Sequence, residues 1–448
     1  QGTSRRRSCR LDPAGRPVKP PMAAPESGSR WNVAVRDPVW KHIWITPELE
    51  AITRTDPFSR LYRIKQLGPA EYVYPGATHS RASHSFGVFH LAHRMLSILL
   101  ETDADQWTTR EGRASFLAAA LLHDLGHFPF THALKELPLL EHEELTAGII
   151  RQNPLSTLIA ASGGDPEMTA AIILGIGQGN AETDFFARIL SGVLDPDKLD
   201  YLNRDAYFCG VPYGIQDTDF ILSHIHADRE RGIVLDTSAI MSVESVLFSK
   251  YLMYRSVYWH RTIRIATAMM KKFLFAALDR SVLCPEEIYP CDDEGIFTLA
   301  EKTRIPECEL ARSLRNRDFY SIVFSSPLSG EAETALESLD QRSHIEELIA
   351  AYLGRVTGKP FESRHVLLDI PERISFESDL FIREEQVSFS ESSTVFSRSV
   401  VTNFVRSLRK VRIAVHPDFF DAVEAIPELG DKLANLTGLH YTVEKDSR

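Results

Sequence analysis

The sequence has few cysteines and no long apolar run, and both shortages exclude classes of protein. The cysteines stand singly along the chain, with no C-x-x-C pair, at Cys9, Cys209, Cys284, Cys291 and Cys308. This scatter suggests neither a disulfide framework nor a thiolate zinc site, so any metal would need histidine and carboxylate ligands. The longest apolar runs, such as 116–122, fall far short of the roughly 20 residues that cross a bilayer.

The chain also lacks an excess of positive charge, since 50 Lys and Arg against 61 Asp and Glu give a formal charge of −11. This balance argues against a general affinity for nucleic-acid backbone, so nucleic-acid binding is not excluded but not indicated. A small anion needs only a local pocket of Lys and Arg, and a nucleotide substrate therefore stays open. No N-terminal stretch has the layout of a secretory signal, so we expect a cytoplasmic protein without a membrane segment.

Composition divides the chain into three parts. Residues 1–30 are rich in Arg, Pro, Gly and Ser, which predicts a disordered tail. Residues 31–280 have apolar residues at helical spacing, which predicts a helical domain. Residues 281–448 add strand candidates at 365–370 and 411–417, so we expect a smaller α+β domain there. The predicted fold class is mainly α, with a helical core and this smaller α+β C-terminal domain.

Local patterns predict individual elements. Helical spacing is found at 84–100, 113–125, 143–152, 308–314 and 334–353, and in one continuous stretch over 243–278. Short β-rich runs at 71–76 and 232–237 indicate small hairpins or loops between helices. The Ser-rich stretch 388–400 is typical of a loop and a strand rather than of a regulatory phosphorylation site.

The segment LLHDLGH (121–127) concentrates titratable groups at the end of an apolar helix. Gly126 and Pro129 would terminate this helix, so His123 and Asp124 emerge where the backbone changes direction. Two adjacent side chains can then converge on one point, which suits a metal ion. A divalent ion takes mixed nitrogen and oxygen donors, and further ligands must come from other helices.

Two further ligand candidates lie on neighbouring predicted helices. His84 lies near the start of the preceding helix, and Asp197 lies in the aspartate-rich segment DPDKLDYLNRD (195–205). A lone histidine at a helix start is usually a core or surface residue, but the joint occurrence of these groups is rarer. Two imidazoles and two carboxylates leave an octahedral ion room for water and a substrate oxygen, as hydrolysis requires.

Four segments together resemble, in order and spacing, the signature of the HD-domain metal-dependent phosphohydrolases. They are HSRASHSFGVFHLAH (79–93), ALLHDLGHFPFTH (120–132), HEE (142–144) and DPDKLDYLNRD (195–205). The similarity is greatest to the deoxynucleoside triphosphate (dNTP) triphosphohydrolase branch, which includes SAM-and-HD-domain proteins and bacterial dGTPases. It begins at 36–49 and runs through 251–261, roughly half of the chain.

The resemblance implies a metal site and its ligands. By residue-by-residue match, His84, His123, Asp124 and Asp197 bind a divalent ion of the Mn, Fe, Ni or Zn class, with Mg on the substrate phosphates. Neutral imidazole and carboxylate donors suit such an ion.

The resemblance also implies three active-site histidines, His127, His132 and His142. An imidazole with a pKa of about 6.5 can pass a proton to a leaving ester oxygen at neutral pH. We expect His132 to be the general acid, and His127 and His142 to position phosphate or the attacking water. His142 has an alternative interpretation as an exposed helix-start residue.

The same match implies substrate-binding residues on two segments. Gln66 and Leu67 would lie against the sugar and base, and Arg81 would contact phosphate with its forked guanidinium. Lys198 would reach a phosphate oxygen, while Tyr201 and Asp205 would read the sugar 3′-hydroxyl. The last two are one helical turn apart and share a face.

On the predicted helix 243–278, Lys250, Tyr254 and Tyr258 recur every fourth residue and form one stripe. Aromatic stripes are otherwise typical of a core. The resemblance implies that Lys250 and Tyr258 contact the triphosphate and the sugar, and it supports Tyr254 less.

Two departures from the family pattern limit what can be carried over. Lys135 stands where the mammalian relative has an aspartate, which puts an Asp–His proton relay in doubt. The positions that match the relative's guanine-nucleotide activator pocket read Arg54, Ser59 and Tyr62 in place of Asp, Gln and Arg. Activation through that pocket is therefore not implied.

The resemblance as a whole implies hydrolysis of a dNTP to deoxynucleoside and tripolyphosphate, by attack of a metal-activated water on the α-phosphorus. One alternative is an HD phosphohydrolase for another nucleotide or phosphoester, such as a nucleoside monophosphate. Another is a nucleotide-sensing or nucleic-acid-binding module with an idle site. Family members commonly assemble, so we expect a homo-oligomer, either a dimer or a tetramer. The preferred base stays open.

Overall fold

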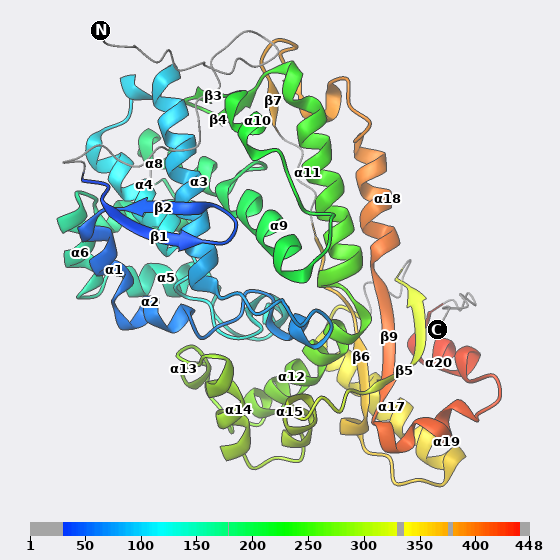
Figure 1. The fold of residues 1–448 in the computed structure, drawn as a ribbon. Coiled ribbons are helices and arrows are strands. Elements are labelled where there is room, and N and C mark those ends of the chain that lie inside the picture. Colours follow the sequence, from blue (N-terminus) through cyan, green and yellow to red (C-terminus); the bar gives the residue numbers. More distant parts are fainter. Residues whose placement is uncertain (1–29, 178, 329–335, 375–379, 440–448) are drawn as a thin grey trace, which may run out of the picture.

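The computed structural model describes residues 30–177, 179–328, 336–374 and 380–439 (Figure 1). The disordered tail predicted for residues 1–30 lies outside this range except for Arg30. The described chain is mainly helical with small sheets, which confirms the predicted fold class.

The helical body fills the upper part of Figure 1, where α3 lies between α4 and α9. Its helices are α1 (Pro47–Thr53), α2 (Asp56–Leu61), α3 (Arg81–Thr102), α4 (Arg110–Leu122), α5 (His142–Ile150), α6 (Leu155–Ser162), α7 (Pro166–Leu174), α8 (Ala181–Leu190), α9 (Pro196–Cys209), α10 (Thr218–Ser223) and α11 (Ile240–Met253). The predictions for 84–100, 113–125 and 143–152 are confirmed as α3, α4 and α5. Polar side chains cap several of these helices; the Ser80 hydroxyl, for example, accepts a hydrogen bond from the amide of Ser83 at the start of α3.

The single helix predicted for 243–278 is wrong. The chain leaves α11 through a π-helical turn, η5 (Tyr254–Tyr258), and α12 (Arg261–Asp279) begins only after an extended His260. The His260 ring accepts a hydrogen bond from the amide of Thr262 and so caps the new helix. Apolar spacing continues through one turn of π-helix, so the sequence pattern does not reveal the break. The change of direction carries α12 away from α11 and into the lower part of the molecule (Figure 1).

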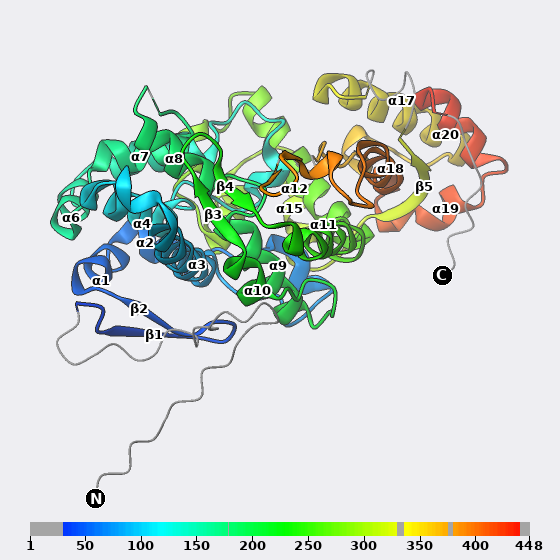
Figure 2. The same ribbon diagram turned by 90° about the horizontal axis from the view of Figure 1, so that it is seen from above.

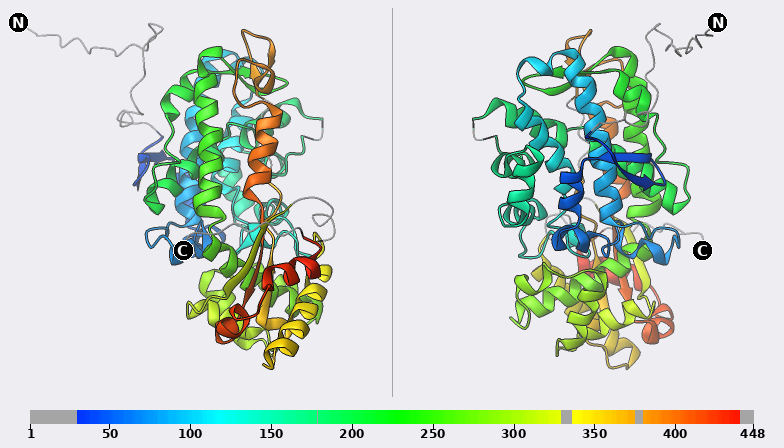
Figure 3. Two further views of the ribbon diagram at one scale, coloured as in Figure 1. Left: turned by 90° about the vertical axis from the view of Figure 1, so that its right-hand side faces the viewer. Right: turned by 60° about the vertical axis from the view of Figure 1, so that its left-hand side comes forward.

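The lower part continues with α13 (Pro285–Ile288), α14 (Asp293–Lys302) and α15 (Cys308–Arg315). It also contains what we call the sheet unit, which comprises β5 (Ser321–Pro327), α17 (Leu339–Thr357), β6 (Val366–Asp369), β9 (Lys410–Val415), α19 (Phe420–Glu424) and α20 (Leu429–Thr437). Its strands are antiparallel in the order β5-β9-β6, and the predicted strands at 365–370 and 411–417 are confirmed as β6 and β9. Both views in Figure 3 show the sheet unit below the helical body, and Figure 2 shows it at the end opposite α1 and α6.

Two smaller sheets were not fully predicted. A hairpin of β1 (Val33–Asp37) and β2 (Lys41–Ile45) lies against the helical body. The other sheet has the order β3-β4-β7-β8, from β3 (Ile225–Asp228), β4 (Gly232–Leu235), β7 (Phe381–Ile382) and β8 (Val387–Ser388). The β-rich run at 232–237 thus becomes β4. The Ser-rich stretch 388–400 holds the end of β8 and, contrary to prediction, the start of a helix, α18 (Arg398–Leu408).

The chain on the two sides of the predicted boundary at 280 is closely associated. Strand β7 pairs with β4 in parallel, and α18 runs beside α11, with the rings of Tyr251 and Phe404 stacked 4.5 Å apart (Figure 3). One hydrophobic core also combines Phe128, Phe273 and Leu310. The boundary itself stays a prediction. No described helix is both long and apolar enough to span a bilayer.

Candidate metal centre and active site

A cavity of about 470 Å³ opens between α3, α9, the segment after α4, η5 and α12. It brings together nearly all of the predicted site residues. Those that line it are His84, His123, Asp124 and Asp197, then His127, His132 and His142, and then Gln66, Leu67, Arg81, Tyr201, Asp205, Lys250 and Tyr258. The exception is Lys198, which is not among the described residues that line the cavity. Its ammonium donates to the Gly192 carbonyl at 2.8 Å and to the Asp195 carboxylate at 2.5 Å.

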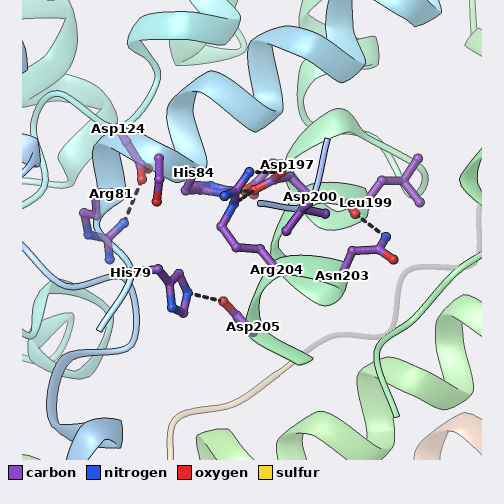
Figure 4. Close-up of polar contacts among 12 residues, drawn as sticks. His79, Arg81, His84, Asp124, Asp197, Leu199, Asp200, Asn203, Arg204 and Asp205 are labelled. Carbon is purple, nitrogen blue, oxygen red and sulfur yellow. Dashed lines mark hydrogen bonds and ion pairs between the residues drawn. The ribbon is translucent and has the colours of Figure 1, made fainter. Parts of the chain in front are cut away.

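His84 lies on the first turn of α3 and is buried, with both ring nitrogens facing carboxylates (Figure 4). Nδ1 is 2.8 Å from Asp200 Oδ2, and Nε2 is 2.9 Å from Asp197 Oδ1. Asp200 is fully buried, whereas the Asp197 side chain is 38% exposed. A carboxylate that accepts from one imidazole nitrogen fixes the ring and directs the other nitrogen at a ligand position. The sequence interpretation did not include Asp200.

A chain of buried charges stands behind this pair. The Arg204 guanidinium donates to Asp200 Oδ2 and to Asp37 Oδ2, each at 2.8 Å, and the Trp40 indole donates to Asp200 Oδ1 at 2.5 Å. Asp37 and Trp40 lie at the end of β1 and in the hairpin turn. A Cβ atom at Gly87 would lie 1.8 Å from Asp200 Oδ1, so any larger residue here would displace the Asp200 carboxylate. Residues of the β1–β2 hairpin, which is distant from His84 in the sequence, thus help to orient the His84 ring through Asp200 and Arg204.

His123 and Asp124 follow the last residue of α4, as predicted. The His123 Nδ1 atom lies 3.0 Å from the Ala120 carbonyl, which makes Nδ1 the donor. Its Nε2 atom is buried without a hydrogen-bond partner among the described residues and is 3.9 Å from Asp197 Oδ1. Asp124 Oδ1 lies 3.3 Å from this Nε2 atom, while Oδ2 accepts from Arg81 at 2.8 Å.

These residues fit a divalent cation. His84, His123 and Asp197 offer ligand atoms that all lie within 4.8 Å of one another. Asp124 lies beside His123 and belongs to a second such group with His127 and His142. A buried imidazole nitrogen without a hydrogen-bond partner, facing carboxylates, is a ready metal ligand.

The charges of the site are strongly coupled. Burial would lower the pKa of His84, but Asp197 and Asp200 outweigh it and raise the pKa to about 10. Loss of solvent contact would raise the pKa of Asp197, but His84 and His123 lower it to about 2. For Asp124 too, burial is outweighed, here by His127, His123 and Arg81, which hold its pKa well below the ordinary value. Two carboxylates that stay ionised favour a bound cation.

The three predicted catalytic histidines gather in one cluster. The His127 and His142 rings are stacked with centroids 3.8 Å apart, and the His132 ring lies 4.7 Å from His127 and 5.7 Å from His142. Burial and the charge of Arg81 lower the pKa of His127 and of His132, and burial and His132 lower that of His142. His142 is 9% exposed, so the alternative of an exposed helix-start residue does not describe it.

The histidine segment, which we define as residues 125–137, is held by unusual backbone contacts. The Arg60 guanidinium donates to the carbonyls of Leu125 at 2.7 Å and of His127 at 2.8 Å. Phe130 has a left-handed backbone (φ 65°) and begins the short 3-10 helix η3 (Thr131–Leu134), which carries His132. A left-handed non-glycine residue beside an active site is typical of functional strain. The sequence pattern gave no signal for Arg60.

The opposite wall of the cavity offers polar groups at the place predicted for the sugar. The Tyr258 hydroxyl donates to Asp205 Oδ2 at 2.7 Å, and His79 Nε2 is 2.8 Å from Asp205 Oδ1. The Tyr201 ring lies 6.3 Å from that of Tyr258. The π-helical turn turns both Tyr254 and Tyr258 into the cavity, and such turns are frequent at functional sites. His79 was not assigned a role from the sequence.

The fold and the site resemble those of one class of protein domain, the HD domain: a helical domain with a His–Asp pair after a central helix. The family comparisons agree with this class. Residues 81–180 match the HD domain, and residues 217–415 match the HD associated region. The chain thus contains an HD domain followed by an HD-associated region, and it resembles the dNTP triphosphohydrolase branch.

Curated relatives include proteins with and without an assigned activity. The chain is 36% identical over 259 residues to an uncharacterized protein of Bacillus subtilis, a match that covers 57% of this chain and 58% of that protein. It is 32% identical over 289 residues to an uncharacterized protein of Methanocaldococcus jannaschii, covering 64% and 58%. It is 26% identical over 343 residues to the deoxynucleoside triphosphate triphosphohydrolase of Homo sapiens, covering 69% and 54%. The aligned region therefore spans little more than half of each relative.

Two solved structures share the fold over nearly their whole length. A hypothetical protein from Aquifex aeolicus has a TM-score of 0.68 at 24% identity, covering 88% of this chain and 99% of that one. A phosphohydrolase from Bacteroides thetaiotaomicron has a TM-score of 0.66 at 24% identity, covering 86% and 99%. At this identity the likeness is one of fold.

Proposed function

We propose that this protein hydrolyses dNTPs to deoxynucleoside and tripolyphosphate. One observation carries the proposal: a single cavity has His and Asp residues that could hold a metal ion, a histidine cluster beside them, and a carboxylate held by a tyrosine on the opposite wall. The first pair of features suits hydrolysis of a phosphoester, and the last suits recognition of a sugar hydroxyl. The human relative named for this activity adds support at 26% identity.

The metal ligands in this proposal are His84, His123, Asp124 and Asp197. A divalent ion of the Mn, Fe, Ni or Zn class, when bound, lowers the pKa of a water molecule and offsets charge that develops on the phosphate. Asp200 holds the ring of His84 so that Nε2 faces the ion position. The Asp197 side chain is 38% exposed and lines the cavity, so the ion position is open to the cavity on this side.

The cluster of histidines acts on the phosphate and on protons. An oxygen of water bonds to the α-phosphorus and this water gives up one proton to solvent, while the bond from the phosphorus to the sugar O5′ breaks and O5′ takes up a proton. His132 donates that proton after the negative charge of the bound triphosphate has raised its pKa, since the free site lowers it. His127 and His142 orient the α-phosphate and the water, and Arg81 and Lys250 bind phosphate oxygens.

The opposite wall reads the sugar. Asp205 has each oxygen engaged once, by Tyr258 and by His79, and each oxygen retains a lone pair that can accept from a 3′-hydroxyl. The Tyr201 and Tyr258 rings border the same space and would crowd a 2′-hydroxyl. Gln66 and Leu67 would lie along the sugar and base. Lys198 would have to leave Asp195 before it could reach a phosphate, so we give it no role in binding.

The proposal extends to the setting of the enzyme. We propose a cytoplasmic homo-oligomer, either a dimer or a tetramer, on the basis of the family resemblance. Light scattering coupled to size-exclusion chromatography measures the mass directly, and a monomer at micromolar concentration would contradict this part.

The decisive experiment identifies the phosphate product. Purified protein is incubated with each of the four dNTPs plus Mn²⁺ and Mg²⁺, and nucleoside and phosphates are separated by anion-exchange chromatography. Intact tripolyphosphate with deoxynucleoside supports attack at the α-phosphorus. Stepwise loss of phosphate, or turnover of a nucleoside monophosphate alone, indicates a different phosphohydrolase. Saturable nucleotide binding without any product indicates a sensing module with an idle site.

A further inference from the structure

The histidine segment is tied to the sheet unit at a residue outside the proposed chemistry. Glu136 follows His132 by four residues and does not line the cavity among the described residues. Its carboxylate receives both ends of one guanidinium, from Arg342 Nη2 to Oε1 at 2.6 Å and from Arg342 Nη1 to Oε2 at 3.0 Å. The Lys271 ammonium donates to the same Oε2 atom at 2.5 Å. The contact joins residues 206 apart in the sequence.

The two cations come from different parts of the fold. Arg342 lies on α17 of the sheet unit and is 5% exposed, and Lys271 lies on α12 and is 7% exposed. Arg342 also donates to the Leu336 carbonyl at 2.5 Å, which fixes its position within the sheet unit. A bidentate Arg–carboxylate pair defines both distance and orientation, unlike a single contact from lysine.

Helix α12 connects this cluster to the cavity. Arg264 lines the cavity and donates to Asp369 Oδ1 at 2.7 Å and to Glu372 Oε2 at 2.8 Å. Lys271 lies two turns further along the same helix. The sheet unit therefore contacts α12 at Arg264, which lines the cavity, and contacts the histidine segment at Glu136.

We propose that the sheet unit positions the catalytic histidine segment through the ion-paired cluster of Glu136, Arg342 and Lys271. This inference rests on the proposed function, because it takes His132 as the proton donor. The three residues of the cluster are positioning residues, since none of them touches the substrate. Through this cluster the sheet unit of the HD-associated region sets where the His132 ring stands relative to the metal ligands.

The physical basis is the cost of leaving charges unpaired in a buried place. Replacement of Glu136 by glutamine removes the countercharge of both Arg342 and Lys271, and buried unpaired charges move toward water or toward another partner. Either movement shifts the segment between Leu134 and Leu137, whose side chains are buried in the core shared with α12. A displacement of about 1 Å at a catalytic group can reduce turnover by roughly 100-fold.

Three variants test the inference in the full-length protein: Glu136→Gln, Arg342→Lys, and Glu301→Gln as a control. Glu301 pairs with Arg315 on the surface, where its side chain is 62% exposed. The measurements are hydrogen–deuterium exchange of residues 125–140, metal content, and kcat and KM for the best dNTP. We expect Glu136→Gln to speed exchange in the histidine segment and to lower kcat by roughly 10–100-fold with KM within about threefold. Metal content should match the wild type.

The other two variants separate positioning from folding. Arg342→Lys keeps the charge but not the bidentate geometry, so its kcat should lie between those of the wild type and Glu136→Gln. Glu301→Gln should match the wild type in every measurement. Exchange that accelerates equally in α3 and α9, or a loss of metal, would show a general structural role and overturn the proposal. Unchanged exchange in the histidine segment would overturn it as well.

The exchange measurement keeps this inference separate from the proposed function. If the protein hydrolyses no dNTP, local loosening of residues 125–137 in Glu136→Gln still supports the positioning contact. If it does hydrolyse dNTPs and Glu136→Gln has wild-type kcat, the positioning role is wrong while the proposed function stands.

Discussion

Two sides of the cavity are held in different ways: the metal side, which comprises the candidate ligands His84, His123, Asp124 and Asp197, and the histidine side, which is the histidine segment (125–137). His84 contacts Asp200, which is ion-paired with Arg204, and Arg204 is in turn ion-paired with Asp37. The histidine segment instead has a left-handed residue, Phe130, and its fixed points are distant contacts to Arg60 and to the sheet unit. One side is thus suited to hold an ion in fixed geometry. The other takes its position from contacts with distant parts of the chain.

The largest expected effect comes from removal of a ligand on the metal side. Asp124→Ala should abolish metal retention and lower turnover by more than about 1,000-fold, because it removes several kcal/mol of transition-state stabilisation. Metal content by elemental analysis and product formation by chromatography check this. His226→Asn is the matched control, since His226 forms a His–Asp pair with Asp236 at 2.9 Å outside the cavity. Turnover by metal-free Asp124→Ala would contradict the mechanism.

The next effect distinguishes the histidine side. His132→Asn should lower kcat by roughly 100–1,000-fold, the usual contribution of a general acid, while metal content stays at the wild-type level. Loss of kcat without loss of metal would separate the two sides of the cavity. Loss of both together would show that His132 belongs to the metal centre instead.

A third change removes the carboxylate that orients the candidate metal ligand His84. Asp200→Asn should reduce metal affinity about 10- to 100-fold, because the amide no longer provides the negative charge that orients and polarises His84. Competition titration with a chelating dye measures this affinity. Asp219→Asn, which removes an exposed partner of Arg94, is the control. Wild-type affinity in Asp200→Asn would mean that the chain of buried charges has no influence on the metal.

A fourth effect concerns the stability of the folded protein rather than its activity. His90 packs beside Trp40, 8% exposed, and burial and the charge of Arg94 lower its pKa to about 4. Between about pH 6.5 and pH 4 the unfolded chain binds a proton at His90 that the folded protein does not. The free energy of unfolding should therefore fall with decreasing pH, by up to about 3 kcal/mol from this group. Urea unfolding at several pH values across this range measures the free energy of unfolding. Its decrease with falling pH should be smaller for His90→Leu than for the wild type, and should equal that of the wild type for the exposed His344→Asn.

Local sequence patterns predicted the elements that carry the site. Apolar spacing located α3, α4 and α5, and the His–Asp motif placed His123 and Asp124 at the end of α4. Strands β6 and β9 were visible as short apolar runs bounded by polar segments. These features depend on neighbours within a few residues, which is the range that periodicity and capping describe.

The remaining features depend on contacts between distant residues. Asp200 meets His84 across 116 residues, and Arg60 meets His127 across 67, so no spacing rule indicates them. Lys198 was expected to face the phosphate, but Asp195, three residues earlier, binds its ammonium. The break after η5 was hidden because apolar residues continue through it. The β1–β2 hairpin, by contrast, has a local signal in the alternating VAVRD and KHIWI runs.

The strand order β5-β9-β6 has a consequence for how the molecule is made on the ribosome. The central strand of the sheet is the last of the three to be synthesised, so β5 and β6 leave the ribosome with no partner between them. Until β9 arrives, two strand edges stay open to wrong pairing with other chains. α17, which carries Arg342, also lacks a completed sheet to pack on during that interval. Protection of these two edges by a chaperone would therefore matter most while residues 370–409 are being made.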